Sequence, residues 1–125
     1  LPISMSDSSE LGKLGELVAA EHLEKNGYAI LDKNFRSTSK AEIDIIASKD
    51  EQIIFVEVKT RRSPFMNEPA QMVPLKKQKQ IMKGANAYIL KNNINMEWRF
   101  DIISIVMKGG TVKIDHLEDA FFPVL

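Results

Sequence analysis

The stretch AEIDIIASKDEQIIFVEVKT, residues 41–60, constrains the fold more than any other part of the chain. Two runs rich in Ile and Val flank the polar segment 48–51, a pattern typical of two antiparallel strands joined by a short turn. Burying an unpaired carboxylate is costly and forces the group to bind a proton or a cation. Asp44, Glu57 and Lys59 nevertheless interrupt the apolar runs. These charges therefore either face water or surround a cation.

Strand geometry predicts where these charges point. Side chains alternate between the two faces of a strand, so Glu57 and Lys59 share one face. If Lys49-Asp50 forms a two-residue turn, Asp44 lies opposite Phe55 and diagonally next to Glu57. A turn that is one residue longer or shorter would move Asp44 to the other face. This register predicts two carboxylates and one ammonium group converging on one point.

Such a convergence has a chemical meaning. Carboxylates at one point repel each other unless a cation or a shared proton relieves them. Oxygen ligands suit Mg²⁺ or Mn²⁺, and such an ion polarises a phosphate and activates a bound water. Lys59 would orient that water or stabilise charge that develops on the phosphate. The pattern predicts phosphodiesterase chemistry, whereas a solvated surface ion pair is the alternative for an isolated Glu-x-Lys triplet.

The rest of the chain reads as alternating helices and strands. We expect a single domain at 11–125, after a flexible N-terminus at 1–10 in which residues 1–4 precede a natural start at Met5. The order predicts an α/β fold, with a mixed central sheet of four or five strands flanked by helices and a crossover helix between strands that could lie parallel. The expected elements are helices at 8–26 and 74–92, strands at 28–35, 42–47, 52–59, 98–107 and 111–115, and a loop at 63–74.

The helix expected at 8–26 carries apolar residues on two sides. One arc contains Leu11, Leu14, Leu17 and Val18, and the opposite arc contains Gly12, Ala19, Ala20 and Leu23. A helix that is apolar on both sides is covered on both sides. Glu16 falls in the small-residue arc, so we expect it to face another element. Asn26-Gly27 is a typical helix stop.

Charge is unevenly distributed although the formal net charge is zero. Between Lys59 and Lys91, eight basic residues are opposed only by Glu68, which gives a local charge of +7. A basic segment beside an acidic cluster predicts phosphate binding, and a solvated helix face is the alternative. The basic residues are Lys59, Arg61, Arg62, Lys76, Lys77, Lys79, Lys83 and Lys91.

Composition excludes several kinds of site. The chain has no Cys, so it has neither disulfides nor thiolate zinc sites, and its two His cannot make a multi-histidine zinc site. It has no apolar run of the roughly 20 residues that a membrane span needs. We expect a cytoplasmic protein without a membrane partner.

The ordered set of motifs resembles the PD-(D/E)XK nuclease superfamily, in which an acidic residue on one strand precedes (D/E)-x-K on the next. More closely, the chain from Leu11 onward resembles the YraN-like family of small bacterial endonuclease-like proteins, which are related to archaeal Holliday-junction resolvases. The segments that carry this resemblance are LGELVAAEHLEKNGYAIL, NFR, AEIDIIA, IIFVEVKTRR, AYI and RFDIISI.

The resemblance implies a restriction-endonuclease-like core and roles for individual residues. Asp44, Glu57 and Glu16 match the metal-binding carboxylates, the Val58 carbonyl is a further expected ligand, and Lys59 matches the catalytic lysine. Ala41 stands where the family usually has Gly, a change without consequence if its φ is negative. The residues expected to contact nucleic acid are Arg61, Arg62, Lys76, Lys77, Gln78, Lys79 and Lys83.

The expected function is a Mg²⁺- or Mn²⁺-dependent DNA endonuclease, with branched or junction DNA as the structure-selective substrate that the resemblance suggests. A non-catalytic nucleic-acid-binding module with the nuclease fold is the alternative, and an interaction protein that docks through AFFPVL is a weaker one. Because junction-cutting relatives are often dimers, a homodimer is a further expectation. Asp101 is expected to be structural and to pair with Arg99 or another basic residue, and His22 is expected at a helix surface.

Overall fold

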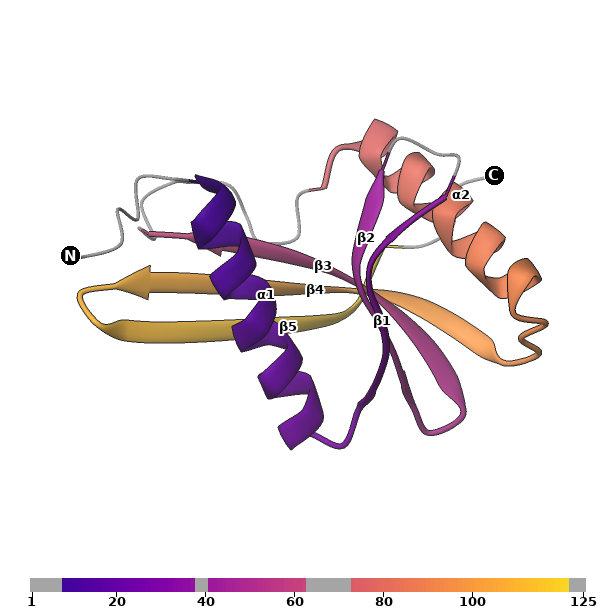
Figure 1. The fold of residues 1–125 in the computed structure, drawn as a ribbon, viewed down its shortest axis with the longest axis horizontal. Coiled ribbons are helices and arrows are strands. Elements are labelled where there is room, and N and C mark those ends of the chain that lie inside the picture. Colours follow the sequence, from indigo (N-terminus) through magenta and orange to yellow (C-terminus); the bar gives the residue numbers. More distant parts are fainter. Residues whose placement is uncertain (1–7, 38–40, 63–72, 122–125) are drawn as a thin grey trace.

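The computed structural model describes residues 8–37, 41–62 and 73–121. Within this part of the chain, helices and strands follow in the order α1, β1, β2, β3, α2, β4 and β5 (Figure 1). Their bounds are α1 Ser8–Lys25, β1 Ala29–Arg36, β2 Glu42–Lys49, β3 Gln52–Arg61, α2 Leu75–Lys91, β4 Glu97–Lys108 and β5 Thr111–Phe121. The loop expected at 63–74 lies mostly outside the described residues, as do residues 1–7 and the tail after Phe121.

The strands form one sheet in the order β1-β2-β3-β4-β5. Strands β3 and β4 are parallel, and the other neighbouring pairs are antiparallel. Parallel neighbours need a crossover connection, and α2 lies in this one. The predicted mixed α/β fold is confirmed and is compatible with a restriction-endonuclease-like core. Strand β5 continues to Phe121, beyond its expected end at residue 115.

The turn between β2 and β3 lies one position later than predicted. Asp50 and Glu51 have φ values of 50° and 61°, and Lys49 pairs with Gln52. Two consecutive positive φ values indicate a type I′ turn, whose twist matches that of the strands it joins. The predicted Lys49-Asp50 turn is therefore wrong. Moving the turn by one position shifts each cross-strand partner by two, so every side chain keeps its predicted face.

The two helices cover opposite faces of the sheet. Successive residues of β3 alternate between two apolar clusters, one beneath each helix. This gives a three-layer arrangement in which the sheet lies between α1 and α2. The α1 cluster includes Ala19, Ala20, Leu23, Ile45, Ile54, Val56 and Ile103, and the α2 cluster includes Ile46, Ile53, Phe55, Ile81, Ala85, Tyr88 and Phe100.

Helix α1 is covered on only one side, so the prediction of two covered arcs is wrong. Ala19 and Leu23 are fully buried, whereas Leu14 is 40% exposed and Leu17 is 61% exposed. The helix ends as predicted, because Gly27 has φ +86° and the Tyr28 N–H donates to the Leu23 carbonyl at 3.0 Å.

Gly15 sets the distance between α1 and the sheet. A Cβ added at Gly15 would lie 1.8 Å from Thr60 Oγ1 and 2.9 Å from Thr60 Cβ. Only glycine permits this approach, because any side chain would push the helix away from β3. The contact holds the first half of α1 against the end of β3, and Glu16 follows directly.

The sheet divides at the start of β2. Pairing between β2 and β3 runs from Lys49–Gln52 to Ile45–Val56, whereas β3 continues to pair with β4 as far as Arg61. Figure 1 shows β1 and β2 turning away from β3 and rising toward the beginning of α2. The separation leaves a fork between β2, β3 and the first turn of α2.

Candidate active site

Asp44 and Glu57 are the first residues beyond the last β2–β3 pair, so they lie at the fork. The next pair in the observed register would join them directly, rather than diagonally as predicted. Asp44 Oδ2 accepts a hydrogen bond of 2.8 Å from the Val58 N–H. Glu57 is only 5% exposed. The structure thus brings the two predicted carboxyl groups together, with Glu57 buried and Asp44 half-buried.

This proximity changes the protonation of Asp44. Burial, the charge of Glu57 and a hydrogen bond with Glu57 together raise the pKa of Asp44 from 3.8 to about 8. The Val58 N–H acts in the opposite direction, and Glu16 adds a smaller increase. Two carboxyl groups in one buried site retain a proton unless a cation replaces it. The donor set therefore fits a hard divalent cation such as Mg²⁺ or Mn²⁺.

Lys77, on the first turn of α2, already supplies a positive charge. Its Nζ forms an ion pair with Glu57 Oε2, although the Lys77 side chain is 42% exposed and that of Glu57 only 4%. A cleft of about 410 Å³ lies beside this pair, lined by Asp44, Lys76 and Lys77 among other residues. The site therefore opens to solvent between β2 and α2.

Glu16 lies near this pair but is held by another partner. Its charge raises the pKa of Asp44, yet its Oε1 accepts a hydrogen bond of 2.9 Å from Asn34 Nδ2. Asn34 lies within β1 and has φ 53°. Among the described residues, no three His, Cys, Asp or Glu side chains form a cluster that could hold a metal. Glu16 contributes negative charge here, and its role as a third ligand stays a prediction.

Lys59 and Val58 continue β3 beyond Glu57. By strand alternation Lys59 shares the face of Glu57, and it is half-buried. Val58 packs against the α1 cluster and donates its N–H to Asp44. Metal coordination by the Val58 carbonyl stays a prediction.

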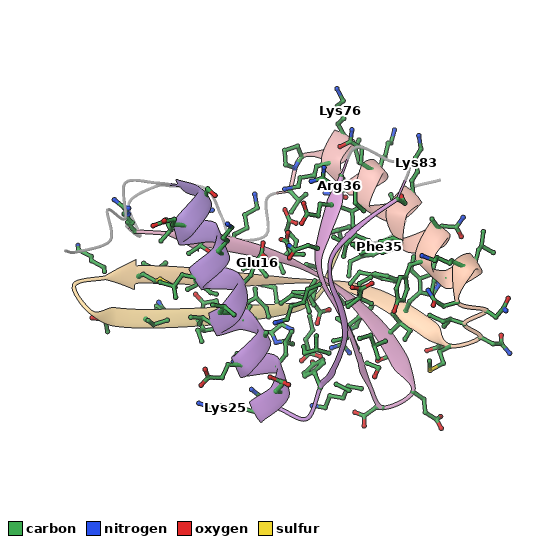
Figure 2. The ribbon with its side chains drawn as sticks, viewed as in Figure 1. Glu16, Lys25, Phe35, Arg36, Lys76 and Lys83 are labelled. Atoms are coloured by element: carbon green, nitrogen blue, oxygen red, sulfur yellow. The ribbon has the colours of Figure 1, made fainter. Side chains whose placement is uncertain are left out.

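Several of the basic residues lie on the α2 side of the fork, whereas Arg62 lines a separate pocket near the turn between β4 and β5. Figure 2 shows Lys76 and Lys83 of α2 and Arg36 of β1 extending to the same side of the molecule. Arg36 bonds Glu42 at 2.8 Å and was not among the predicted contacts, although the NFR motif contained it. Lys79 is also exposed on α2, and Arg62 is exposed just after β3.

Two predicted contact residues are less available than the others. Gln78 Nε2 donates to the Val73 carbonyl at 2.8 Å, which ties the start of α2 to the preceding residues. Arg61, at the end of β3, is partly buried. Contact of either residue with nucleic acid stays a prediction.

A second polar cluster lies on the face of the sheet that α1 covers. The sequence indicated this cluster only in part. Asp101 is completely buried and accepts hydrogen bonds from Arg99 Nε at 2.9 Å and from the Asp119 N–H at 3.0 Å. His116 Nε2 lies 2.8 Å from Asp101, and His116 Nδ1 lies 3.3 Å from His22 Nε2. The predicted pairing of Asp101 with Arg99 is confirmed, and His22 is partly buried rather than at the surface.

Hydrogen bonds keep Asp101 ionised despite its burial. Burial by itself would raise the pKa of Asp101, but the bonds from His116 and Arg99 outweigh it and lower this pKa. Arg99 also reaches the Tyr28 hydroxyl at 2.9 Å. The cluster links α1, β4 and β5 with Tyr28, which lies just before β1. The sequence signal was limited to the Arg99-x-Asp101 spacing, because the histidines are distant along the chain.

The fold and the site define a mixed α/β protein with a largely buried carboxyl pair where its sheet divides. No helix in the described part of the chain is long and apolar enough to cross a membrane. Residues 15–105 match the sequence profile of a family described as "Uncharacterised protein family UPF0102". The chain belongs to this family.

Several UPF0102 proteins resemble the chain over nearly its whole length. One from Flavobacterium psychrophilum is 42% identical over 118 residues, which cover 94% of this chain and 98% of the relative. One from Bacteroides thetaiotaomicron is 40% identical over 121 residues, covering 97% and 99%. One from Trichlorobacter lovleyi is 45% identical over 125 residues, covering 97% of each.

Proposed function

We propose that this protein is a metal-dependent endonuclease that hydrolyses phosphodiester bonds in DNA. The observation that carries the proposal is the pair of the half-buried Asp44 and the buried Glu57, which lies beside a cleft with lysines on its rim. Paired buried carboxyl groups are costly for stability, and sites with strongly shifted pKa values are enriched in catalytic centres. The lysines and Arg36 supply the positive surface that a polyanion requires.

Each residue would have a distinct task. Asp44 and Glu57 would hold Mg²⁺ or Mn²⁺, with Glu16 as an outer carboxylate. The bound ion would supply Lewis acidity at the scissile phosphate and lower the pKa of a water. The Lys59 ammonium group would stabilise charge that develops on the phosphate. Lys76, Lys79 and Lys83 would bind flanking phosphates without reading the sequence.

A cleavage assay tests this proposal. Labelled four-way junction, flap, single-stranded and duplex DNA would each be incubated with Mg²⁺ or Mn²⁺. We expect metal-dependent cutting that Glu57→Gln and Lys59→Met abolish while circular dichroism shows an intact fold. Lys25→Gln is the matched control, because Lys25 lies at the far end of α1 (Figure 2). Equal cutting by wild type and Glu57→Gln would refute the proposal, and the preferred substrate would define the class.

A second candidate is a nucleic-acid-binding module that retains the fold without catalysis. The ion pair of Lys77 with Glu57 favours it, because a lysine already occupies the carboxylate that a metal needs. This candidate predicts salt-dependent DNA binding that is unchanged in Glu57→Gln, together with no Mn²⁺ binding by calorimetry.

A further inference from the structure

Lys77 occupies an unusual position for a helical lysine. The N-terminal end of a helix carries partial positive charge and favours acidic side chains. The first turn of α2 contains no acidic residue, and its N-cap, Pro74, makes no side-chain capping bond. Lys76 and Lys77 stand in this turn instead. The partial positive charge at the start of α2 therefore disfavours the Lys77 ammonium group, and a carboxylate of the sheet offsets this repulsion.

That compensation is the ion pair with Glu57. Glu57 is buried beside Asp44, so it needs a positive partner more than an exposed carboxylate does. Lys77 reaches it from a position that is 42% exposed. A long, flexible side chain at the edge of a cleft can exchange one partner for another without moving the helix.

We propose that Lys77 is a placeholder cation that couples metal binding to polyanion binding. This inference rests on the proposed function, because it assigns Glu57 to a divalent cation. Lys77 holds Glu57 when the divalent cation is absent. When the carboxylate takes the cation, Lys77 leaves it and binds a substrate phosphate at the cleft. In the metal-free protein, Lys77 therefore opposes the binding of a divalent cation.

Thermodynamic linkage turns this exchange into measurable quantities. The ammonium group and the cation compete for one carboxylate, so Lys77 weakens metal binding in the free protein. A phosphate that captures Lys77 removes the competition, and metal must then strengthen DNA binding by the same factor. Coupling of this kind commonly amounts to about 5–150-fold in affinity.

The first experiment measures Mn²⁺ binding by calorimetry without DNA. We expect Lys77→Gln to bind Mn²⁺ at least about tenfold more tightly than wild type, within the usual coupling range. The matched control is Lys76→Gln, which removes the same charge from the same turn and cleft but not from Glu57. The Mn²⁺ affinity of Lys76→Gln should stay within about threefold of the wild-type affinity, because an exposed charge interacts weakly. Lys77→Arg, which keeps the charge, should stay close to wild type.

The second experiment measures the coupling in a Lys59→Met background, which prevents turnover. Duplex DNA should tighten Mn²⁺ binding by about tenfold in Lys59→Met, and this gain should vanish when Lys77→Gln is added. Melting in EDTA supplies a readout without metal. Lys77→Gln should melt below Lys76→Gln, because Glu57 loses its counter-charge, and Mn²⁺ should restore the difference.

The outcomes separate this inference from the proposed function. Equal Mn²⁺ affinity in wild type and Lys77→Gln would refute the placeholder role and leave the nuclease proposal standing. Equal affinity in Lys76→Gln and Lys77→Gln, both tighter than wild type, would show general electrostatics and would also refute it. No Mn²⁺ binding by any variant would refute both. Cleavage that depends on Glu57 with unchanged coupling would support only the proposed function.

Discussion

Replacing Asp44 by Asn should stabilise the fold at alkaline pH. Burial and Glu57 raise the pKa of Asp44 from 3.8 to about 8. A raised carboxyl pKa means that the folded state binds more protons than the unfolded state between these values, so stability falls as pH rises. Asparagine imitates the neutral carboxyl group and still accepts the Val58 N–H. The substitution therefore removes this loss of stability.

The size of the effect follows from linkage. Each unit of pKa shift corresponds to about 1.4 kcal/mol, so at pH 8 the full effect is about 5 kcal/mol. The new amide N–H₂ needs a partner in the same site, which lowers the expected gain to about 2–5 kcal/mol. For a domain of this size the melting temperature should rise on the order of 5–15 °C. Below pH 4 Asp44 is protonated in both states, so the gain disappears and Asp44→Asn should be no more stable than wild type.

Urea denaturation of metal-free protein at pH 4, 6 and 8 measures this difference directly. Asp115→Asn, an exposed change on β5, is the control and should have little effect at any pH. Asp44→Asn could instead be no more stable than wild type at pH 8 while its circular dichroism stays native. That result would refute the inference that ionisation of Asp44 destabilises the fold. An equal difference at pH 4 and pH 8 would show that ionisation is not the cause.

The remaining predictions concern the packing of α1 and the second polar cluster. Gly15→Ala should cost about 1–3 kcal/mol of unfolding free energy, because its Cβ would collide with Thr60; Thr60→Ala should recover part of this loss in chemical denaturation. Burial and His116 lower the pKa of His22, so wild-type stability should decline as pH falls below 6.5, and His22→Gln should show a smaller decline between pH 7.5 and 5.5. Asp101→Ala should lower the free energy of unfolding, measured in urea, by about 3–5 kcal/mol, because it leaves Arg99 without its buried partner. A decrease below about 1 kcal/mol, as is usual for an exposed residue, would contradict this expectation.

The sequence by itself determined the elements and the faces of the strands. Alternation along β3 placed Glu57 and Lys59 on one face and Ile54, Val56 and Val58 on the other, because the side-chain period of a strand is local. The segment between β3 and β4 was long enough for the predicted crossover helix, and α2 lies in it. Ala41 meets the condition under which it can replace glycine, since it is not among the described residues with positive φ.

Register and long-range contacts were decided by the tertiary structure. The choice between turns at 49–50 and 50–51 depends on how β2 and β3 twist together, so the sequence placed Asp44 diagonal to Glu57 instead of opposite it. The division of the sheet, which creates the cleft, results from the packing of β2 toward α2. No local pattern encodes it.

The charged contacts most clearly separate what the sequence predicts from what tertiary packing decides. The basic segment predicted a positive surface, but only the packed helix brings Lys77 to Glu57. Only the folded chain joins His22 to His116, which are 94 residues apart in sequence. Local periodicity determines which way a side chain points along its own element, whereas its partner depends on how distant elements pack. The sequence therefore supplied the carboxylates and lysines, and the tertiary structure decided which of them meet.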